Sequence, residues 1–278
     1  MTRIEVATPE HLAELVTLLN EDRLPGQPLV TEAMIADTLN RVSTVDQWYY
    51  EQLVETRVLV VRDQSHRVVG AVAYGDTHQG VRDVLWLVAQ EPPIITALLD
   101  AVFAEWSGPA RAFWYASTVS AGLEGLPRQH AGAVHDALVS RGFTGRDLWS
   151  YQRLVLSATK ATCDVGFAET GIIHDATGTG VASYEIAIPY QGIGVLWWLE
   201  TDEAHRGHGH GRAALDEALS TLSEHGATEV ILYVDDDDHS GERDRNPAKA
   251  LYASVGFREV DRLWSYSKGE LPPEGMGA

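Results

Sequence analysis

Residues 195–212 read VLWWLETDEAHRGHGHGR, and this stretch decides the fold. It begins as a mostly apolar strand, passes through an acidic turn and then glycines at 207, 209 and 211, and continues into a helical pattern over 212–225. Glycine lets backbone N–H groups approach a ligand closely, and the helix directs its positive end at the same place. A strand, a glycine loop and a helix N-terminus in this order predict a site for a phosphate or pyrophosphate.

The spacing within the loop distinguishes between the known glycine motifs. A dinucleotide fingerprint requires G-x-G-x-x-G, but Arg212 stands where its last glycine belongs. A P-loop requires G-K-[ST], and the stretch has none. The pattern that fits is R-x-x-G-x-G, at Arg206, Gly209 and Gly211. A second motif follows after an intervening strand, because residues 246–257 read NPAKALYASVGF.

The two motifs together resemble the signature of the GNAT superfamily of N-acetyltransferases. The loop is similar to the family's pyrophosphate loop, and residues 246–257 are similar to its N-x-x-A-x-x-L-Y…G-F element. The resemblance is specific over about 194–268 and extends only to the fold over 1–156. It implies acetyl-CoA as co-substrate and transfer of an acetyl group to an amine.

An internal repeat predicts two copies of this fold. Residues 139–153 read VSRGFTGRDLWSYQR, and residues 253–268 read ASVGFREVDRLWSYSK. The fold class expected is α/β with a mixed sheet (α+β), in two tandem GNAT-like domains, an architecture similar to that of the mycothiol synthases. The expected boundaries are a degenerate domain at 1–156, a catalytic domain at 157–268 and a flexible tail at 269–278.

The hydrophobic periodicity predicts the elements of both copies. In the first copy we expect helices at 10–20, 31–41, 94–106 and 129–141, and strands at 3–6, 57–62, 67–75, 82–89, 111–117 and 147–156. In the second we expect strands at 163–173, 180–190, 194–201, 228–235 and 259–267, and helices at 210–225 and 246–255. The first copy has prolines instead of a glycine loop after 82–89, so we expect it not to bind CoA.

The resemblance also assigns roles to individual residues. It implies that the backbone at the end of the strand forms hydrogen bonds with the pantetheine arm; the residues concerned are Leu199, Glu200 and Thr201. The loop Arg206, Gly207, His208, Gly209, His210 and Gly211, with Arg212, would hold the pyrophosphate, and Asn246 would contact the CoA arm. Tyr252 matches the general acid that protonates the departing thiolate.

The general base is left open between three carboxylates and a water chain. Many family members carry a Glu early in the fourth strand, but the corresponding residues here are Gly192, Ile193 and Gly194. The candidates are Glu200 first, then Asp235 and Glu185. The tandem tryptophans 197 and 198 are expected to lie on opposite faces of the sheet, with one of them in the core.

The formal charge of −19, from 40 acids and 21 bases, excludes some partners. It argues against nucleic acid and against anionic membranes, and it is compatible with a cationic small-molecule amine. Three histidines crowd the loop, at 205, 208 and 210, but no tetrahedral set of ligands accompanies them, so no metal is expected. The predicted location is cytoplasmic, and a homodimer is left open.

The predicted function is acetyl-CoA-dependent N-acetylation of a small amine, such as an amino sugar, an antibiotic or a thiol precursor. Transfer would take place by direct attack of the amine within a ternary complex. Two alternatives remain at this point. One is a protein or peptide N-acetyltransferase, and the other is a non-catalytic acyl-CoA-binding sensor or scaffold.

Overall fold

The computed structural model describes residues 3–42, 47–114, 123–156, 168–235 and 245–272. The chain divides into two compact units. The N-terminal unit consists of Met1–Leu148 and Asp261–Ala278, and the C-terminal unit consists of Trp149–Val260. Both units are mixed α/β, as the sequence predicts.

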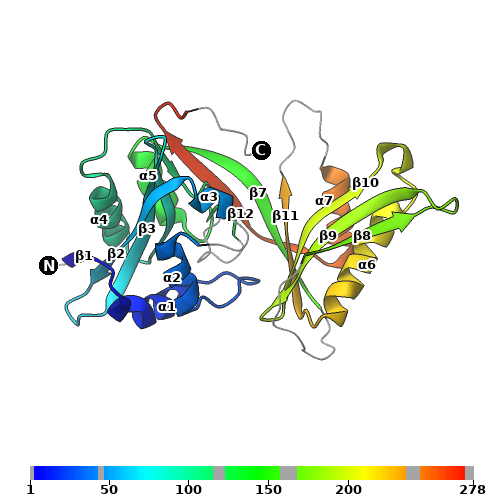
Figure 1. Cartoon of the computed structure of the whole chain (residues 1–278), viewed down its shortest axis with the longest axis horizontal. Coiled ribbons are helices and arrows are strands. Elements are labelled where there is room, and N and C mark those ends of the chain that lie inside the picture. The colour runs from blue at the N-terminus through cyan, green and yellow to red at the C-terminus, as the bar shows by residue number, and fades with distance from the viewer. Residues whose placement is uncertain (1–2, 43–46, 115–122, 157–167, 236–244, 273–278) are drawn as a thin grey trace. The chain divides into compact units, whose positions relative to one another are not determined.

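The N-terminal unit is a mixed sheet with helices (Figure 1). Its strands are β1 (Arg3–Val6), β2 (Leu53–Arg62), β3 (Val68–Thr77), β4 (Arg82–Ala89), β5 (Ala110–Ala112) and β6 (Leu126–Pro127). Its helices are α1 (Leu12–Glu21), which follows the 3-10 turn η1 (Pro9–His11), and α2 (Glu32–Asn40), α3 (Gln47–Tyr50), α4 (Pro92–Phe103) and α5 (Gly132–Ser140). Strands β1 to β4 pair in order as antiparallel neighbours, and β4 pairs with β5 in parallel.

The C-terminal unit repeats this plan with fewer helices. Its strands are β7 (Thr144–Val155), β8 (Ala168–His174), β9 (Gly180–Tyr190), β10 (Ile193–Thr201) and β11 (Glu229–Asp235), and β12 (Arg258–Lys268) begins in it. Its helices are α6 (His210–Glu224), preceded by the 3-10 turn η2 (Glu203–His205), and α7 (Asn246–Val255). The strand order is β7-β11-β10-β9-β8, with β10 and β11 parallel and the other neighbours antiparallel.

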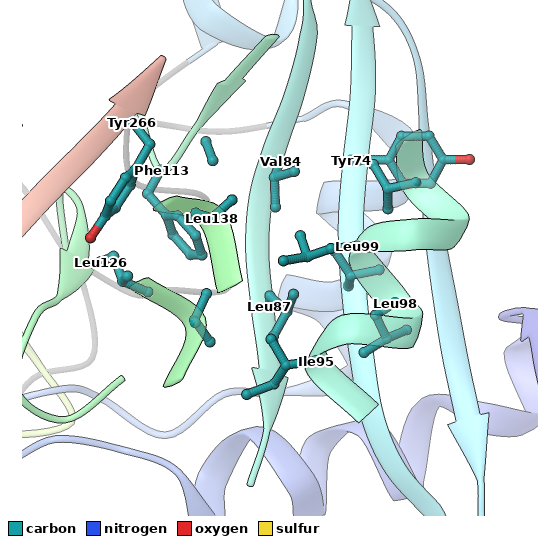
Figure 2. Close-up of a cluster of buried hydrophobic side chains, with 14 of the residues drawn as sticks. Tyr74, Val84, Leu87, Ile95, Leu98, Leu99, Phe113, Leu126, Leu138 and Tyr266 are labelled. Atoms are coloured by element: carbon teal, nitrogen blue, oxygen red, sulfur yellow. The ribbon is translucent and has the colours of Figure 1, made fainter. Parts of the chain in front are cut away.

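One core of the N-terminal unit lies between α4 and the sheet. Figure 2 shows Ile95 and Leu99 of α4 beside Val84 and Leu87 of β4, and Leu98 belongs to the same buried cluster. The spacing of these α4 residues places them on one face of the helix, and all three are fully buried. A second core on the other face of the sheet is covered by α1 and α2.

The core of the C-terminal unit lies under α6 and α7. Ala214, Leu215, Ala218 and Leu222 of α6 are all fully buried, and their spacing gives the helix one apolar face. A Cβ atom at Gly194 would lie 2.7 Å from Leu222 Cδ2, so glycine at this position allows α6 to pack on β10. A glutamate side chain at this point of the strand would therefore collide with Leu222.

The two units exchange their last strands. Residues Trp149–Val155 of β7 pair with β11 in the C-terminal unit, whereas Tyr266–Lys268 of β12 pair with β5 in the N-terminal unit. The compact units therefore differ from the expected domains 1–156 and 157–268, because each unit takes a strand from the other half of the sequence. Pairing across strands depends on residues far apart in the chain, so the repeat alone does not indicate the exchange.

The expected elements are otherwise found, with ends shifted by a few residues. Strand β9 and helix α7 have the predicted bounds, and α6 ends one residue early. Helix α3 and the short strand β6 were not predicted. Part of the expected strand 111–117 and part of the expected strand 163–173 lie outside the described residues. Of the helices that the structure describes, none is long and apolar enough to cross a membrane.

Candidate active site

Strands β10 and β11 separate in the middle of the C-terminal sheet. They pair in parallel from Ile193↔Glu229 to Leu196↔Leu232 and no further, although β10 continues to Thr201 and β11 to Asp235. Beyond Leu196, the backbone of β10 pairs with β9 alone among the described strands. Its other edge therefore presents backbone N–H and C=O groups that a ligand lying between the strands can use.

A β-bulge in β10 lies where the two strands begin to separate. Leu196 is opposite Ile186 of β9 and Trp198 is opposite Glu185, so Trp197 is the extra residue. A bulge interrupts the alternation of side chains between the two faces. The expectation that one tryptophan lies in the core is wrong, because Trp197 is 37% exposed and Trp198 is 51% exposed.

The register across the sheet shows which side chains share the face opposite α6. Leu196 and Leu199 of β10 pack against the core under α6. Glu200 lies opposite Ser183, and Trp198 lies opposite Glu185, on the other face of the sheet. We call this other face of the C-terminal sheet the open face. It brings together Glu185 and Glu200, two of the three predicted bases.

The glycine loop leads directly into α6. Gly207 and Gly209 have φ angles of 79° and 88°, a left-handed conformation that favours glycine, and Gly209 is the N-cap of α6. The first turn of α6 receives no side-chain cap from this residue, so its N–H groups are available to an anion. A Cβ atom at either glycine would have no atom within 4 Å, which leaves room beside the loop.

Gly211 has a different role from the other two glycines. A Cβ atom at this position would lie 2.9 Å from Thr201 Oγ1 and 3.7 Å from Leu251 Cδ2. Gly211 therefore allows the first turn of α6 to lie against the end of β10 and against α7. This packing fixes the direction in which the N–H groups of the turn point.

For acetyl-CoA, the co-substrate that the resemblance implies, we expect Gly211→Val to raise the KM by about tenfold, because small displacements of binding groups are costly. The valine side chain would push α6 away from Thr201 and move the loop with it. Ala213→Val is the matched control, since residue 213 is exposed on the same helix and receives the same valine side chain. Equal KM values in the two variants would contradict this role. Steady-state kinetics and thermal unfolding make the comparison.

The two arginines of the loop are placed differently. Arg206 is exposed and donates from Nε to the backbone oxygen of Thr201 at 3.2 Å. Arg212 donates from Nε to both carboxylate oxygens of Asp216, at 2.8 and 2.9 Å, and from Nη1 to Ser254 Oγ at 3.4 Å. Both side chains are anchored near the loop, but only Arg206 has its charge without a carboxylate partner among the described residues.

The histidines of the loop lie near one another, but the described residues around them do not form a set of metal ligands. The ring centroids of His205 and His210 are 6.2 Å apart, and those of His208 and His210 are 6.4 Å apart. Within the described ranges, no three His, Cys, Asp or Glu side chains are arranged to bind a metal ion.

The three candidate bases have distinct surroundings. Glu200 is exposed and accepts a hydrogen bond at 3.3 Å from Trp198 Nε1. Glu185 is exposed on β9, opposite Trp198. Asp235, at the end of β11, pairs with Arg245 at 2.6 Å. The carboxylate of Asp235 is therefore already engaged by a guanidinium group, whereas Glu200 accepts a hydrogen bond from a neutral indole.

Tyr252 and Asn246 both belong to α7. Asn246 is exposed at the first position of the helix. Tyr252 is 8% exposed, packs edge-on against Phe257 at 5.9 Å, and belongs to the core under α6 and α7. Burial raises the pKa of Tyr252 to about 12, although the charge of Arg245 acts in the opposite direction. Tyr252 is therefore protonated at neutral pH, as a general acid must be.

The N-terminal unit has a similar bulge but no glycine loop. Strands β4 and β5 pair only up to Val84↔Ala112, and Leu85 is the extra residue of a bulge in β4. Counted from the last pair, Trp86 corresponds to Trp198. It is 4% exposed, and its Nε1 has no hydrogen-bond partner among the residues that the structure describes. After β4 the chain enters α4 through Pro92 and Pro93, which lack backbone N–H groups.

Trp198 is the site residue whose contact the sequence analysis missed. The sequence predicts only that one of the two tryptophans lies in the core, yet Trp198 donates a hydrogen bond to Glu200, the first-ranked base. The repeated triplet Val-Leu-Trp at 84–86 and 195–197 aligns Trp86 with Trp197, one residue away from the correspondence with Trp198 that the strand pairing gives. Using the triplet requires the positions of the two bulges, which come from the partner strands.

Comparison with known proteins identifies the class of this site. Residues 146–257 match the model of the acetyltransferase (GNAT) family. The chain therefore carries a GNAT acetyltransferase domain, and this domain contains the separated strands, the glycine loop and α7.

The relatives place this domain in a tandem architecture. A mycothiol acetyltransferase of Catenulispora acidiphila is 38% identical over 74 residues, which are 26% of this chain and 21% of that protein. The chain thus matches about a fifth of the length of this relative. A tandem GNAT protein from the clavulanic acid biosynthesis pathway has the same fold, with a TM-score of 0.59, 13% identity and coverage of 98% of this chain and 100% of that one. A GNAT protein from Sphaerobacter thermophilus gives a TM-score of 0.58 at 11% identity, over 96% and 95% of the two chains.

Proposed function

We propose that the protein is an acetyl-CoA-dependent N-acetyltransferase that acts on a small-molecule amine. The observation that carries this proposal is the end of β10–β11 pairing at Leu196↔Leu232, next to a glycine loop that opens α6. It provides a strand edge with unused backbone groups beside a helix N-terminus suited to pyrophosphate. The match of residues 146–257 to the GNAT family supports the same reaction.

The residues of the loop fit the co-substrate. Acetyl-CoA supplies the acetyl group and is an anion at its pyrophosphate. The N–H groups at the start of α6, the exposed Arg206 and the open space beside Gly207 and Gly209 suit that charge. The free edge of β10 over Leu199–Thr201 suits the amide groups of the pantetheine arm. A backbone N–H at this edge would stabilise the negative charge that develops on the thioester oxygen.

Glu200 is the general base that the surroundings favour. An ammonium group must lose a proton before its nitrogen can attack the thioester carbon. Glu200 lies at the open edge of β10 and is held by Trp198 Nε1, whereas Asp235 is engaged with Arg245. Glu185 lies on the same face and would add negative charge that attracts a cationic acceptor. Tyr252 would then protonate the departing thiolate of CoA.

A thiol-release assay with acetyl-CoA tests this function directly. The wild-type chain is expected to release free CoA thiol in the presence of small amines, and Glu200→Gln is expected to lower kcat/KM by about 10²-fold. Glutamine keeps an oxygen for Trp198 Nε1 but cannot accept the proton. Glu224→Gln, at the exposed end of α6, is the control and keeps wild-type activity.

Three outcomes would redirect the proposal. Full activity in Glu200→Gln would assign the base to Glu185 or to a water molecule. Transfer to peptide amines alone would indicate a protein or peptide acetyltransferase. Binding of acetyl-CoA without transfer to any amine would indicate an acyl-CoA sensor.

A further inference from the structure

The open face presents two neighbouring tryptophans to solvent beside the proposed base. Trp197 is 37% exposed and Trp198 is 51% exposed, and both lie where β10 leaves β11. Tryptophan buries a large apolar surface when it is packed, so two exposed rings in sequence form an uncovered apolar patch. Patches of this kind mark binding sites more often than isolated exposed residues do.

Trp197 is the outer ring of an aromatic stack. Tyr151 and Tyr233 are stacked with centroids 5.6 Å apart and planes 24° apart. Trp197 continues the stack, 6.4 Å from Tyr233 at an angle of 26°. Tyr151 is fully buried, whereas Trp197 is exposed, so the stack runs across β7, β11 and β10 and ends at a ring that solvent reaches. Such an end is suited to one more ring in parallel orientation.

Trp198 connects this apolar patch to the acidic groups. Its Nε1 donates a hydrogen bond to Glu200 Oε2 at 3.3 Å, and its Cα is opposite that of Glu185. The aromatic faces attract cations, as the two carboxylates do. A ligand that combines a ring with an ammonium group therefore matches both parts of the open face.

In the N-terminal unit, the position that corresponds to Trp198 is part of the hydrophobic core. Trp86 corresponds to Trp198 in register, and Val88 corresponds to Glu200. Trp86 and Val88 are buried in the core under α1 and α2, at 4% and 3% exposure, and Trp86 Nε1 has no partner among the described residues. At this position, the described residues of the C-terminal unit place an exposed indole beside a carboxylate that accepts its N–H, whereas those of the N-terminal unit do not.

We infer that the acceptor is a primary amine carried on a ring, which stacks on Trp197 and Trp198 with its ammonium group directed to Glu200. This inference rests on the proposed function and specifies its substrate class. An aromatic ring and the apolar face of a sugar ring offer the same stacking chemistry. Trp197 determines specificity, and Trp198 is in addition a positioning residue that holds the carboxylate of Glu200.

The test compares kcat/KM for ring amines with kcat/KM for linear amines at a constant concentration of acetyl-CoA. The ring amines are glucosamine and tyramine, and the linear amines are spermidine and butylamine. Wild-type kcat/KM is expected to be at least tenfold higher for one of the ring amines than for either linear amine. The ring amine that is preferred decides between a sugar and an aromatic acceptor.

Substitutions separate stacking from positioning. Trp197→Ala is expected to raise the KM for the preferred ring amine about tenfold with little change in kcat, and Trp197→Tyr is expected to restore most of the affinity because a ring is present again. Trp198→Phe keeps a ring but loses the N–H donor, so kcat is expected to fall severalfold while KM stays within about twofold. Trp48→Phe, an exposed tryptophan of the N-terminal unit, is the control.

The inference and the proposed function can fail separately. Equal kcat/KM values for ring and linear amines, or an unchanged KM in Trp197→Ala, would overturn the inference while acetyl transfer stands. If the wild type releases no thiol with any of the four amines, the proposed function fails. Calorimetric titration of the full chain with glucosamine and with tyramine then decides: binding that is lost in Trp197→Ala supports the ring site, and any other result overturns it.

Discussion

A chain that ends at Val260 is expected to have an unfolded N-terminal unit, although the residues removed are the last of the sequence. Asp261–Lys268 of β12 belong to that unit, where Tyr266 pairs with Ala112 of β5 and Leu263 pairs with Pro127 of β6. Figure 2 shows Tyr266 beside Phe113 in the core. The truncation therefore removes a core strand rather than a tail.

The interactions lost are large compared with the stability of a domain. Leu263 and Tyr266 are fully buried, and a truncated buried leucine or aromatic residue costs about 2–5 kcal/mol. The buried carboxylate of Asp261 accepts hydrogen bonds from the backbone N–H groups of Gln129 at 3.0 Å and His130 at 2.9 Å. Tyr266 Oη lies 2.7 Å from His135 Nδ1. Together these losses match a typical unfolding free energy of about 5–15 kcal/mol.

Differential scanning calorimetry measures this effect. The full chain and a chain that ends at Gly269 are expected to unfold with the same enthalpy, because Gly269 follows β12. The chain that ends at Val260 is expected to lose the part of the enthalpy that belongs to the N-terminal unit. An unchanged enthalpy in the shortest chain would show that β12 does not stabilise this unit.

The same exchange determines how the C-terminal half behaves alone. A fragment of residues 157–278 has the expected second domain, but it lacks Trp149–Val155, the part of β7 that pairs with β11. Strand β11 would then have an unpaired edge in the middle of the sheet, next to the proposed site. We therefore expect this fragment to aggregate, and a soluble, active fragment would contradict the exchange.

The sequence predicts features that depend on neighbours along the chain. The periodicity of Ala214, Leu215 and Ala218 predicts α6, and the glycines at 207, 209 and 211 predict the loop before it. Trp197 and Trp198 show the limit of such patterns, because strict alternation places them on opposite faces. The bulge that changes this depends on the register with β9, and nothing in residues 193–201 indicates it.

For the chemistry of the site, the sequence indicates the candidate residues but not the contacts that they make. The stretch NPAKALY at 246–252, one residue shorter than N-x-x-A-x-x-L-Y, makes Asn246 and Tyr252 candidates, but it does not indicate that burial raises the pKa of Tyr252. The ranking of the carboxylates changes because Asp235 meets Arg245, ten residues away. Strand exchange and ion pairs arise from contacts that only the folded chain makes, and these contacts decide which acid remains free to accept a proton.

Tyr252→Phe is expected to lower kcat by about 10²-fold or more, since proton transfer from a positioned side chain contributes about 10²–10⁴-fold. The KM for acetyl-CoA is expected to stay within about twofold, because phenylalanine keeps the ring that packs against Phe257. The structure shows no hydrogen bond from Tyr252 Oη to another described residue, so thermal stability at neutral pH is expected to be unchanged. A tyrosine that served packing alone would leave kcat unaltered.

The pH dependence gives a second, independent check of Tyr252. Burial raises its pKa to about 12, above the value of 10 for an exposed tyrosine, so the proton is bound more tightly in the folded state. The stabilisation that this provides is fully present below pH 10 and is lost as the pH rises toward 12, by about 3 kcal/mol in total. Wild-type activity should therefore show no loss from ionisation of Tyr252 below about pH 11, and Tyr252→Phe should unfold less readily than the wild type above pH 10. Tyr190→Phe, an exposed tyrosine of the same unit, is the control and keeps both wild-type profiles.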